Sequence, residues 1–106
     1  MYNKQMFLKI PDKIKIGGFI YTVYFTDNIS HDHLAECDYR NTSIFIRSSI
    51  NRQRQEQAFL HEIIHAVMSN SGYVHEQDEK IVDGIANGLY ALIVDNPTLF
   101  EVAECD

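Results

Sequence analysis

The chain has 106 residues, which suits one domain with a real hydrophobic core and is too short for two. Hydrophobic residues make up 45% of the chain and charged residues 23%, both ordinary values for a globular protein. The net charge is −6 and no basic run exceeds two residues, which argues against direct nucleic-acid binding because such binding needs a clustered cationic surface.

Composition also indicates a soluble, cytoplasmic protein that does not bind membranes. Residues 1–10 carry Lys4 and Lys9 but lack the continuous apolar stretch of a signal peptide or a membrane anchor. Cys37 and Cys105 are far apart and fit no metal or redox spacing, so we expect free thiols in a reducing compartment. The oligomeric state stays open at this point.

The first half of the chain, residues 1–48, is predicted to be rich in β-strands. Residues 13–16 alternate in polarity, Gly17 and Gly18 predict a turn, and residues 19–26 are rich in β-branched and aromatic side chains, which together indicate a hairpin. Residues 27–32 predict a polar loop. Residues 35–39 and 43–47 flank a short polar stretch and predict a second hairpin, whose second strand should be covered on both faces.

Two helices are predicted in the second half. The first spans about residues 51–70, with Asn51 as N-cap and Gly72 as the stop, and it is apolar nearly all round, so we expect it to be buried. The second spans about residues 75–95 and ends before Pro97, leaving residues 98–106 as a short tail. The pattern predicts a single α+β domain in which a small antiparallel or mixed sheet of about four strands packs on two main helices.

The second helix is expected to pack on the first through an apolar stripe. This stripe consists of Val82, Ile85, Ala86, Leu89, Leu92 and Ile93. Gly84 and Gly88 lie inside the helix, where each glycine lowers helix propensity by up to about 1 kcal/mol. Their presence predicts a close approach of the two helices.

The most informative motif is His-Glu-Ile-Ile-His at residues 61–65. On a helix, His61 and His65 lie about one turn apart, so both imidazoles project from one face and can bind one metal ion. Glu62 beside them is a candidate general base. Burying these groups is unfavourable unless a divalent cation compensates them. Zinc suits imidazole and carboxylate ligands best, and cobalt, nickel or iron would also bind. The alternative interpretation is a pair of core histidines, each satisfied by a hydrogen bond.

A catalytic zinc site usually has three protein ligands, so a third ligand is expected outside this motif. The extended pattern HExxHxxGxxH is excluded, because Met68 stands at its glycine position and Ser71 at its histidine position. On the second helix, Glu79 shares the expected buried face and should point at the first helix, with Asp83 one turn further on. A solvated acidic face is the alternative interpretation of both acids.

The motif followed by Glu79 and Asp83 resembles the HExxH…ExxxD arrangement of gluzincins, the thermolysin-like zinc metallopeptidases. Within that clan, the layout is similar to the small ImmA/IrrE-type and phage-encoded metallopeptidases. The resemblance covers roughly residues 13–97, and its specific part is confined to residues 57–93. It implies that Glu79 is the third zinc ligand and that Asp83 orients a ligand imidazole through its other nitrogen.

The chain departs from the ImmA/IrrE pattern in two places. Ile64 stands where glycine usually precedes the second histidine, and residues 83–87 match an E-x-x-A-N motif with Asp83 in place of glutamate. That alignment would make Asp83 the ligand. SprT-like proteins use a third histidine instead, which keeps His75 as an option. Glu79 is favoured because its side chain reaches further and ExxxD accounts for both acids.

The resemblance implies a zinc-dependent metallopeptidase that hydrolyses a peptide bond in a protein substrate. Glu62 would activate the zinc-bound water, and a phage or prophage regulatory protease would fit. Candidates for stabilising the oxyanion are Tyr73, His75 and Tyr90. An extended substrate is expected to add to an edge strand, assigned here to the strand from Ser43 to Arg47.

A non-catalytic zinc-binding protein-interaction module on the same scaffold is the alternative function. The intact Glu62 favours the enzyme, because a purely structural metal site needs no base. His31 and His33 lie on a polar loop, where solvated side chains are a simpler interpretation than a second metal site.

Overall fold

The computed structural model describes residues 8–102, which form a four-stranded sheet and two helices. The strands are β1 (Lys13–Ile16), β2 (Phe19–Phe25), β3 (Ala35–Asp38) and β4 (Ser43–Ile46), and the helices are α1 (Arg52–Asn70) and α2 (Glu79–Asp95). The predicted α+β class is confirmed, with the strands preceding the helices. The expectations for the first seven residues and for Cys105 concern parts of the chain outside this description.

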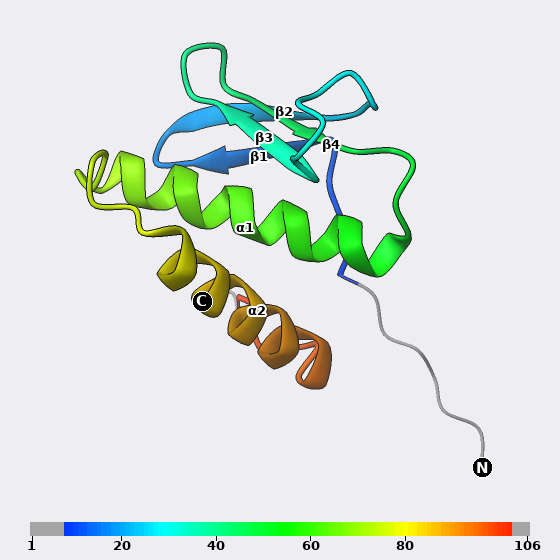
Figure 1. The fold of residues 1–106 in the computed structure, drawn as a ribbon. Coiled ribbons are helices and arrows are strands. Elements are labelled where there is room, and N and C mark those ends of the chain that lie inside the picture. Colours follow the sequence, from blue (N-terminus) through cyan, green and yellow to red (C-terminus); the bar gives the residue numbers. More distant parts are fainter. Residues whose placement is uncertain (1–7, 103–106) are drawn as a thin grey trace.

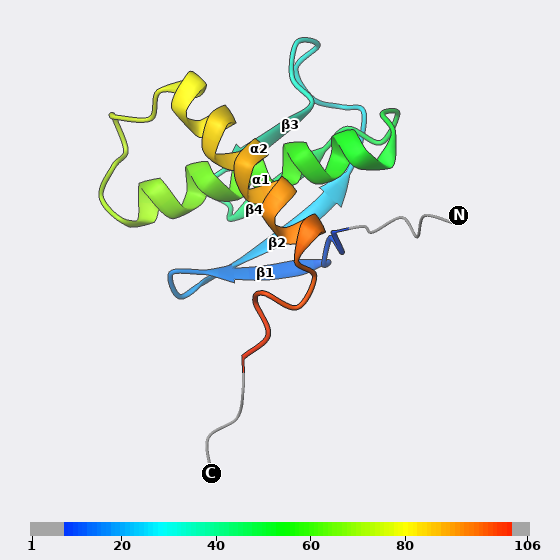
Figure 2. The same cartoon turned by 90° about the horizontal axis from the view of Figure 1, so that it is seen from below.

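The elements form three layers, with α1 between the sheet and α2 (Figure 1, Figure 2). On the sheet side, Phe59 of α1 packs with Ile44 and Ile46, both of which are fully buried. On the opposite side, Leu60 of α1 packs with Ala86 and Tyr90 of α2. The nearly all-round apolar character of α1 follows from this middle position, because a helix covered on two sides needs two apolar faces.

The sheet is mixed, with the strand order β1-β2-β4-β3. β1 and β2 are antiparallel, β2 and β4 are parallel, and β4 and β3 are antiparallel. The strand from Ser43 to Arg47, assigned above to the sheet edge, is therefore an interior strand, and that assignment is wrong. The hairpin pattern correctly predicted that β3 pairs with β4. Because β2 pairs in parallel with the other side of β4, β3 becomes the edge strand.

Turns and caps match the sequence signals closely. Gly17 and Gly18 have φ angles of 56° and 93° and join β1 to β2, a backbone that glycine adopts freely. The Asn51 side chain accepts a hydrogen bond from the Arg54 N–H and caps α1. α1 ends in a Schellman motif, in which the N–H of Tyr73 donates to the carbonyl of Met68 and Gly72 has a φ of 94°.

α2 differs from the prediction at its start and on its surface. It begins at Glu79 rather than near residue 75, because the Asp78 carboxylate accepts from the N–H groups of Lys80 and Ile81 and caps the helix there. Val82, Ala86 and Tyr90 form its buried face.

The predicted stripe is confirmed in part. Leu89 and Ile93 are partly buried and pack against the cluster of Leu60, Ala86 and Tyr90. Ile85 and Leu92 are exposed, because α2 packs on α1 alone among the described elements and so buries a narrow face. Gly84 and Gly88 are exposed too, and apart from adjacent residues and the backbone of α2 itself no described atom lies within 4 Å of where a Cβ would stand at either position. The predicted close approach of the helices at these glycines is wrong.

The segment after α2 forms turns, with the N–H of Leu99 donating to the carbonyl of Asn96 and that of Glu101 to the carbonyl of Thr98. Residues 103–106 of the predicted tail are outside the described part of the chain. Within residues 8–102, no helix combines the length and the apolar character needed to span a membrane.

Candidate metal centre

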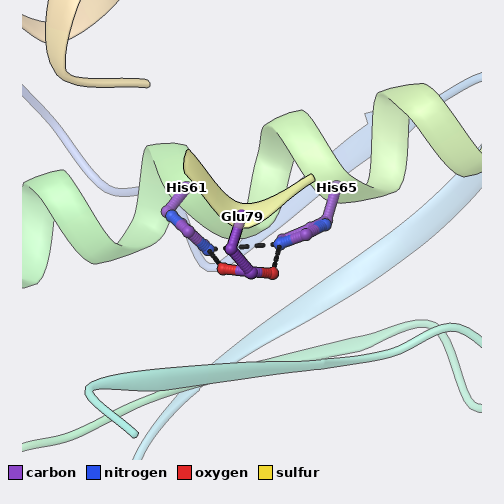
Figure 3. A group of neighbouring side chains, drawn as sticks. All are labelled: His61, His65 and Glu79. Atoms are coloured by element: carbon purple, nitrogen blue, oxygen red, sulfur yellow. Dashed lines mark hydrogen bonds and ion pairs between the residues drawn. The ribbon is translucent and has the colours of Figure 1, made fainter. Parts of the chain in front are cut away.

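Three side chains from α1 and α2 meet at one point (Figure 3). His61 and His65 project from successive turns of α1 toward α2, and Glu79 is the first residue of α2. The Nε2 atoms of the two histidines are 3.2 Å apart. The carboxylate oxygens of Glu79 lie 3.0 Å from Nε2 of His61 and 2.7 Å from Nε2 of His65. The structure therefore brings together the three residues that the sequence singled out as ligands.

The outer nitrogen of His61 is held by an acid. Its Nδ1 lies 2.7 Å from a carboxylate oxygen of Asp83, one turn beyond Glu79 on α2. An ionised carboxylate only accepts hydrogen bonds, so Nδ1 can donate its proton to Asp83 and leave Nε2 available to a metal ion. Asp83 thus occupies the position of an orienting group beside a ligand histidine, and it does not itself join the converging atoms.

The outer nitrogen of His65 is held by Gln77, a residue the sequence did not single out. The Gln77 amide nitrogen donates to the carbonyl of Tyr73 and contacts the hydroxyl of Ser69, both at 2.7 Å. Because the Tyr73 carbonyl can only accept, the Gln77 amide oxygen faces His65 and accepts from Nδ1. The Nε2 of His65 faces the Glu79 carboxylate and can bind a metal ion through its lone pair when it carries no proton.

The converging atoms form a set that suits a cation. Two imidazole nitrogens and a carboxylate face one another, and either a metal ion between them or protons on the imidazoles would compensate the carboxylate. Ligands at tetrahedral zinc, each about 2.1 Å from the metal, are separated by about 3.4 Å. The observed separations of 2.7 to 3.2 Å come close to that value. The donor types and spacing fit a zinc ion with three protein ligands.

A cleft of about 780 Å³ opens beside this cluster. One wall is α1, which contributes His61, Glu62 and His65, and the other is the edge strand β3 with Ala35, Glu36 and Cys37. Glu62 is held within the wall, and burial raises the pKa of its carboxyl to about 8, with further upward contributions from the charges of Glu79 and Glu36. A carboxyl beside the candidate ion and facing the cleft occupies the position of a general base.

The thiol of Cys37 lies in the opposite wall of the cleft. Burial, reinforced by the negative charges of Glu62 and Asp38, raises its pKa to about 12. The thiol is outside the group of converging ligand atoms, so the donors of this site are imidazole and carboxylate.

The remaining candidates do not join the cluster. Tyr90 donates its hydroxyl proton to Glu56 at 3.0 Å inside the α1–α2 interface, so its assignment as an oxyanion stabiliser is wrong. Tyr73 and His75 are exposed in the connection between the helices, where Tyr73 contributes its carbonyl to Gln77 and His75 is outside the converging set. His33 lines the cleft on the loop before β3, with Nδ1 3.8 Å from Glu36.

Sequence reasoning missed Gln77 because it precedes the cap of α2 and so has no place in a helical periodicity. The one signal for Gln77 was its place in a connection rich in amide and acid groups, which follows a candidate ligand histidine that needs an orienting partner. Chemically, the cluster can hold a divalent cation on three ligands with its open side toward the cleft, next to Glu62. Comparison of the chain with protein-family models, with curated proteins and with solved structures found no match.

Proposed function

We propose that this protein is a zinc-dependent metallopeptidase in which His61, His65 and Glu79 hold the ion. The observation that carries the proposal is the convergence of two imidazole nitrogens and a carboxylate, with both histidines oriented through their outer nitrogens. Orienting partners of this kind typically accompany histidine ligands of metals. Two histidines with only structural roles would not need Glu79 shared between their Nε2 atoms in addition to a separate acceptor at each Nδ1.

A bound zinc ion would supply a Lewis acid that polarises a substrate carbonyl and acidifies a water molecule. Glu62 would take the proton of that water and deliver it to the leaving amine. Its place in the cleft wall beside His61 gives it access to both groups. The positive charge of the ion would favour the carboxylate form that a base requires, against the effect of burial on the pKa of Glu62.

The substrate would bind along β3, in place of the strand from Ser43 to Arg47. The N–H of Arg47 donates to the carbonyl of Leu34, which places residues 34, 36 and 38 in the positions that bond to β4. The backbone groups of Ala35 and Cys37 then point to the open edge, toward the cleft. An extended peptide added there would gain main-chain hydrogen bonds next to the metal ligands, with little dependence on its sequence.

The test compares wild type with Glu62→Gln and Glu79→Ala, with Glu76→Gln as an exposed acidic control. Bound zinc is counted by elemental analysis, and cleavage of a random-sequence peptide library is followed by mass spectrometry. We expect one zinc in wild type and Glu62→Gln, loss of zinc in Glu79→Ala, and a rate about 10²- to 10⁴-fold lower in Glu62→Gln.

Each outcome decides between the functions. Equal cleavage by wild type and Glu62→Gln would overturn Glu62 as base. One zinc in both proteins without cleavage by either would favour the non-catalytic zinc-binding module. Failure of wild type to retain zinc would remove the metal site itself, because three converging acceptors would then have to be satisfied by protons.

A further inference from the structure

Residues 71–78 connect α1 to α2, and Gln77 is the one residue among them that is not exposed to solvent. Its amide oxygen faces Nδ1 of His65. Its amide nitrogen lies 2.7 Å from the hydroxyl oxygen of Ser69 and 2.7 Å from the carbonyl oxygen of Tyr73. The oxygen and both hydrogens of the amide therefore have partners, which holds this side chain in place within an otherwise exposed connection.

An amide has an acceptor end and a donor end, whereas an ionised carboxylate only accepts. Asp83, which holds the outer nitrogen of His61, therefore presents an acceptor whichever way its carboxylate turns. Gln77 presents one in a single orientation. If its amide were reversed, the NH2 group would donate to Nδ1 of His65, and the proton of the neutral ring would lie on Nε2. Because a protonated Nε2 cannot bind a metal ion, the orientation of Gln77 decides whether His65 can be a ligand.

The carbonyl of Tyr73 selects this orientation. A backbone carbonyl only accepts hydrogen bonds, so it favours the NH2 group, and a reversed amide would place two acceptor oxygens against each other. The Ser69 hydroxyl accepts the second amide hydrogen. Because a hydroxyl can also donate, Ser69 strengthens the orientation of Gln77 without selecting it. The selection depends on where the Tyr73 carbonyl lies.

The place of the Tyr73 carbonyl follows from the way α1 ends. The N–H of Tyr73 donates to the carbonyl of Met68 at 2.8 Å, and Gly72 has a φ of 94°, which residues with a side chain rarely adopt. Apart from its chain neighbours, no described atom lies within 4 Å of a Cβ built at Gly72. Glycine is therefore favoured at this position by its backbone angle and not by crowding.

We propose, on the basis of the zinc site proposed above, that the turn formed by Gly72 and Tyr73 is a positioning element of the metal centre. Through the Tyr73 carbonyl it holds the Gln77 amide in the orientation that lets His65 bind the ion through Nε2. Gly72 and Ser69 are outside the converging ligand set. Both are positioning residues, because they act on His65 through Gln77.

The first test compares two glycines with the same backbone strain. Gly72 and Gly18 have φ angles of 94° and 93°, and a Cβ at either position has open space, but Gly18 lies in the turn between β1 and β2. Urea unfolding with a chelator measures stability, and competition with a chromophoric chelator measures zinc affinity. We expect Gly72→Ala and Gly18→Ala to lose similar stability, and Gly72→Ala alone to bind zinc about tenfold more weakly. Equal zinc affinities in the two variants would overturn the proposal.

A second pair of variants tests the amide itself. Ser69→Ala removes one acceptor of Gln77, whereas Ser71→Ala removes the hydroxyl of an exposed neighbour. NMR of the zinc-free protein with ¹⁵N-labelled histidine follows the Nδ1 proton of His65. We expect this proton to exchange slowly with water in wild type and Ser71→Ala, and faster in Ser69→Ala and Gly72→Ala. An Nδ1 of His65 without a proton in wild type would overturn the orientation assigned to Gln77.

The zinc affinities separate failure of this proposal from failure of the metal centre. If wild type does not bind zinc, the metal centre is overturned and the role of the turn with it. If wild type binds zinc and both Gly72→Ala and Ser69→Ala bind it equally well, the role of the turn alone is overturned.

Discussion

Two carboxylates join α1 to α2 at different points of the same interface, and their surroundings are opposite in kind. Glu56 is fully buried and is surrounded by donors: the N–H of Leu8 at 2.8 Å, Nε of Arg52 at 2.9 Å and the hydroxyl of Tyr90 at 3.0 Å. Glu79 is mostly exposed and faces two imidazole nitrogens, and the outer nitrogens of both rings have acceptors of their own in Asp83 and Gln77.

The difference separates a structural acid from a candidate ligand. A carboxylate that serves the fold is enclosed by the donors that compensate its burial, so it needs nothing further. A carboxylate that faces nitrogens able to bind a metal ion is open to a cation. Charge alone does not distinguish the two cases, because both acids lie against histidine- or arginine-bearing turns of α1. Burial and the number of enclosing donors do distinguish them.

The largest expected effect comes from removing the structural acid. Glu56→Ala should lower the free energy of unfolding by about 2–4 kcal/mol, because Arg52 and the Tyr90 hydroxyl lose their partner, although half-exposed Arg52 regains some hydration. Glu79→Ala should change the stability of the zinc-free protein by no more than about 0.5 kcal/mol. Urea unfolding with a chelator measures both. Comparable losses in the two variants would contradict the distinction.

A smaller effect is expected from the two groups that orient the histidines. Gln77→Ala and Asp83→Ala should each weaken zinc binding by about 10- to 100-fold without abolishing it, because the ligand rings lose their orientation. Glu79→Ala should weaken binding more than either, and Glu76→Ala should have no effect. Competition with a chromophoric chelator gives the affinities. If Asp83→Ala proves more damaging than Glu79→Ala, Asp83 is the ligand and Glu79 is not.

The smallest effect is expected from Tyr90, which donates a hydrogen bond to Glu56. Tyr90→Phe removes one hydrogen bond to Glu56 and should lower the free energy of unfolding by about 1 kcal/mol. Its zinc affinity and its peptidase rate should match those of wild type, since Tyr90 lies outside the metal centre. Tyr73→Phe, which alters an exposed ring, is the matched control for stability. A lower peptidase rate of Tyr90→Phe with unchanged stability would show instead that Tyr90 takes part in the reaction.

Local signals in the sequence predicted most of the elements. The alternation of residues 13–16, the glycine pair at 17 and 18, the cap at Asn51 and the stop at Gly72 all act over a few residues, and the structure has each of them. The meeting of Glu79 with His61 and His65 was also predictable, because helical periodicity aims all three side chains at the same interface. Their role as zinc ligands stays a prediction.

The errors concern features that depend on distant parts of the chain. β4 became an interior strand because β2 pairs with it in parallel, and no local pattern encodes that pairing. The burial of Glu56 was not predicted, because two of its donors, Leu8 and Tyr90, are far away in the sequence. The third donor, Arg52, lies one helical turn away, where a pair of opposite charges is also common on exposed helix surfaces. The glycines of α2 were predicted to face α1, whereas the structure exposes them. The sequence of α2 did not indicate which of its faces α1 covers.

The pairing of α1 with α2, which follow each other in the sequence, has a consequence for the order in which parts of the protein fold. All candidate ligands come from one helix–loop–helix unit, whose contacts are local and which closes a short loop between Ser71 and Asp78 at a small entropic cost. Such units form within microseconds, whereas the parallel pairing of β2 with β4 must wait for more distant segments to meet. We therefore expect zinc to accelerate the early, helical phase of refolding and to leave the completion of the sheet unchanged.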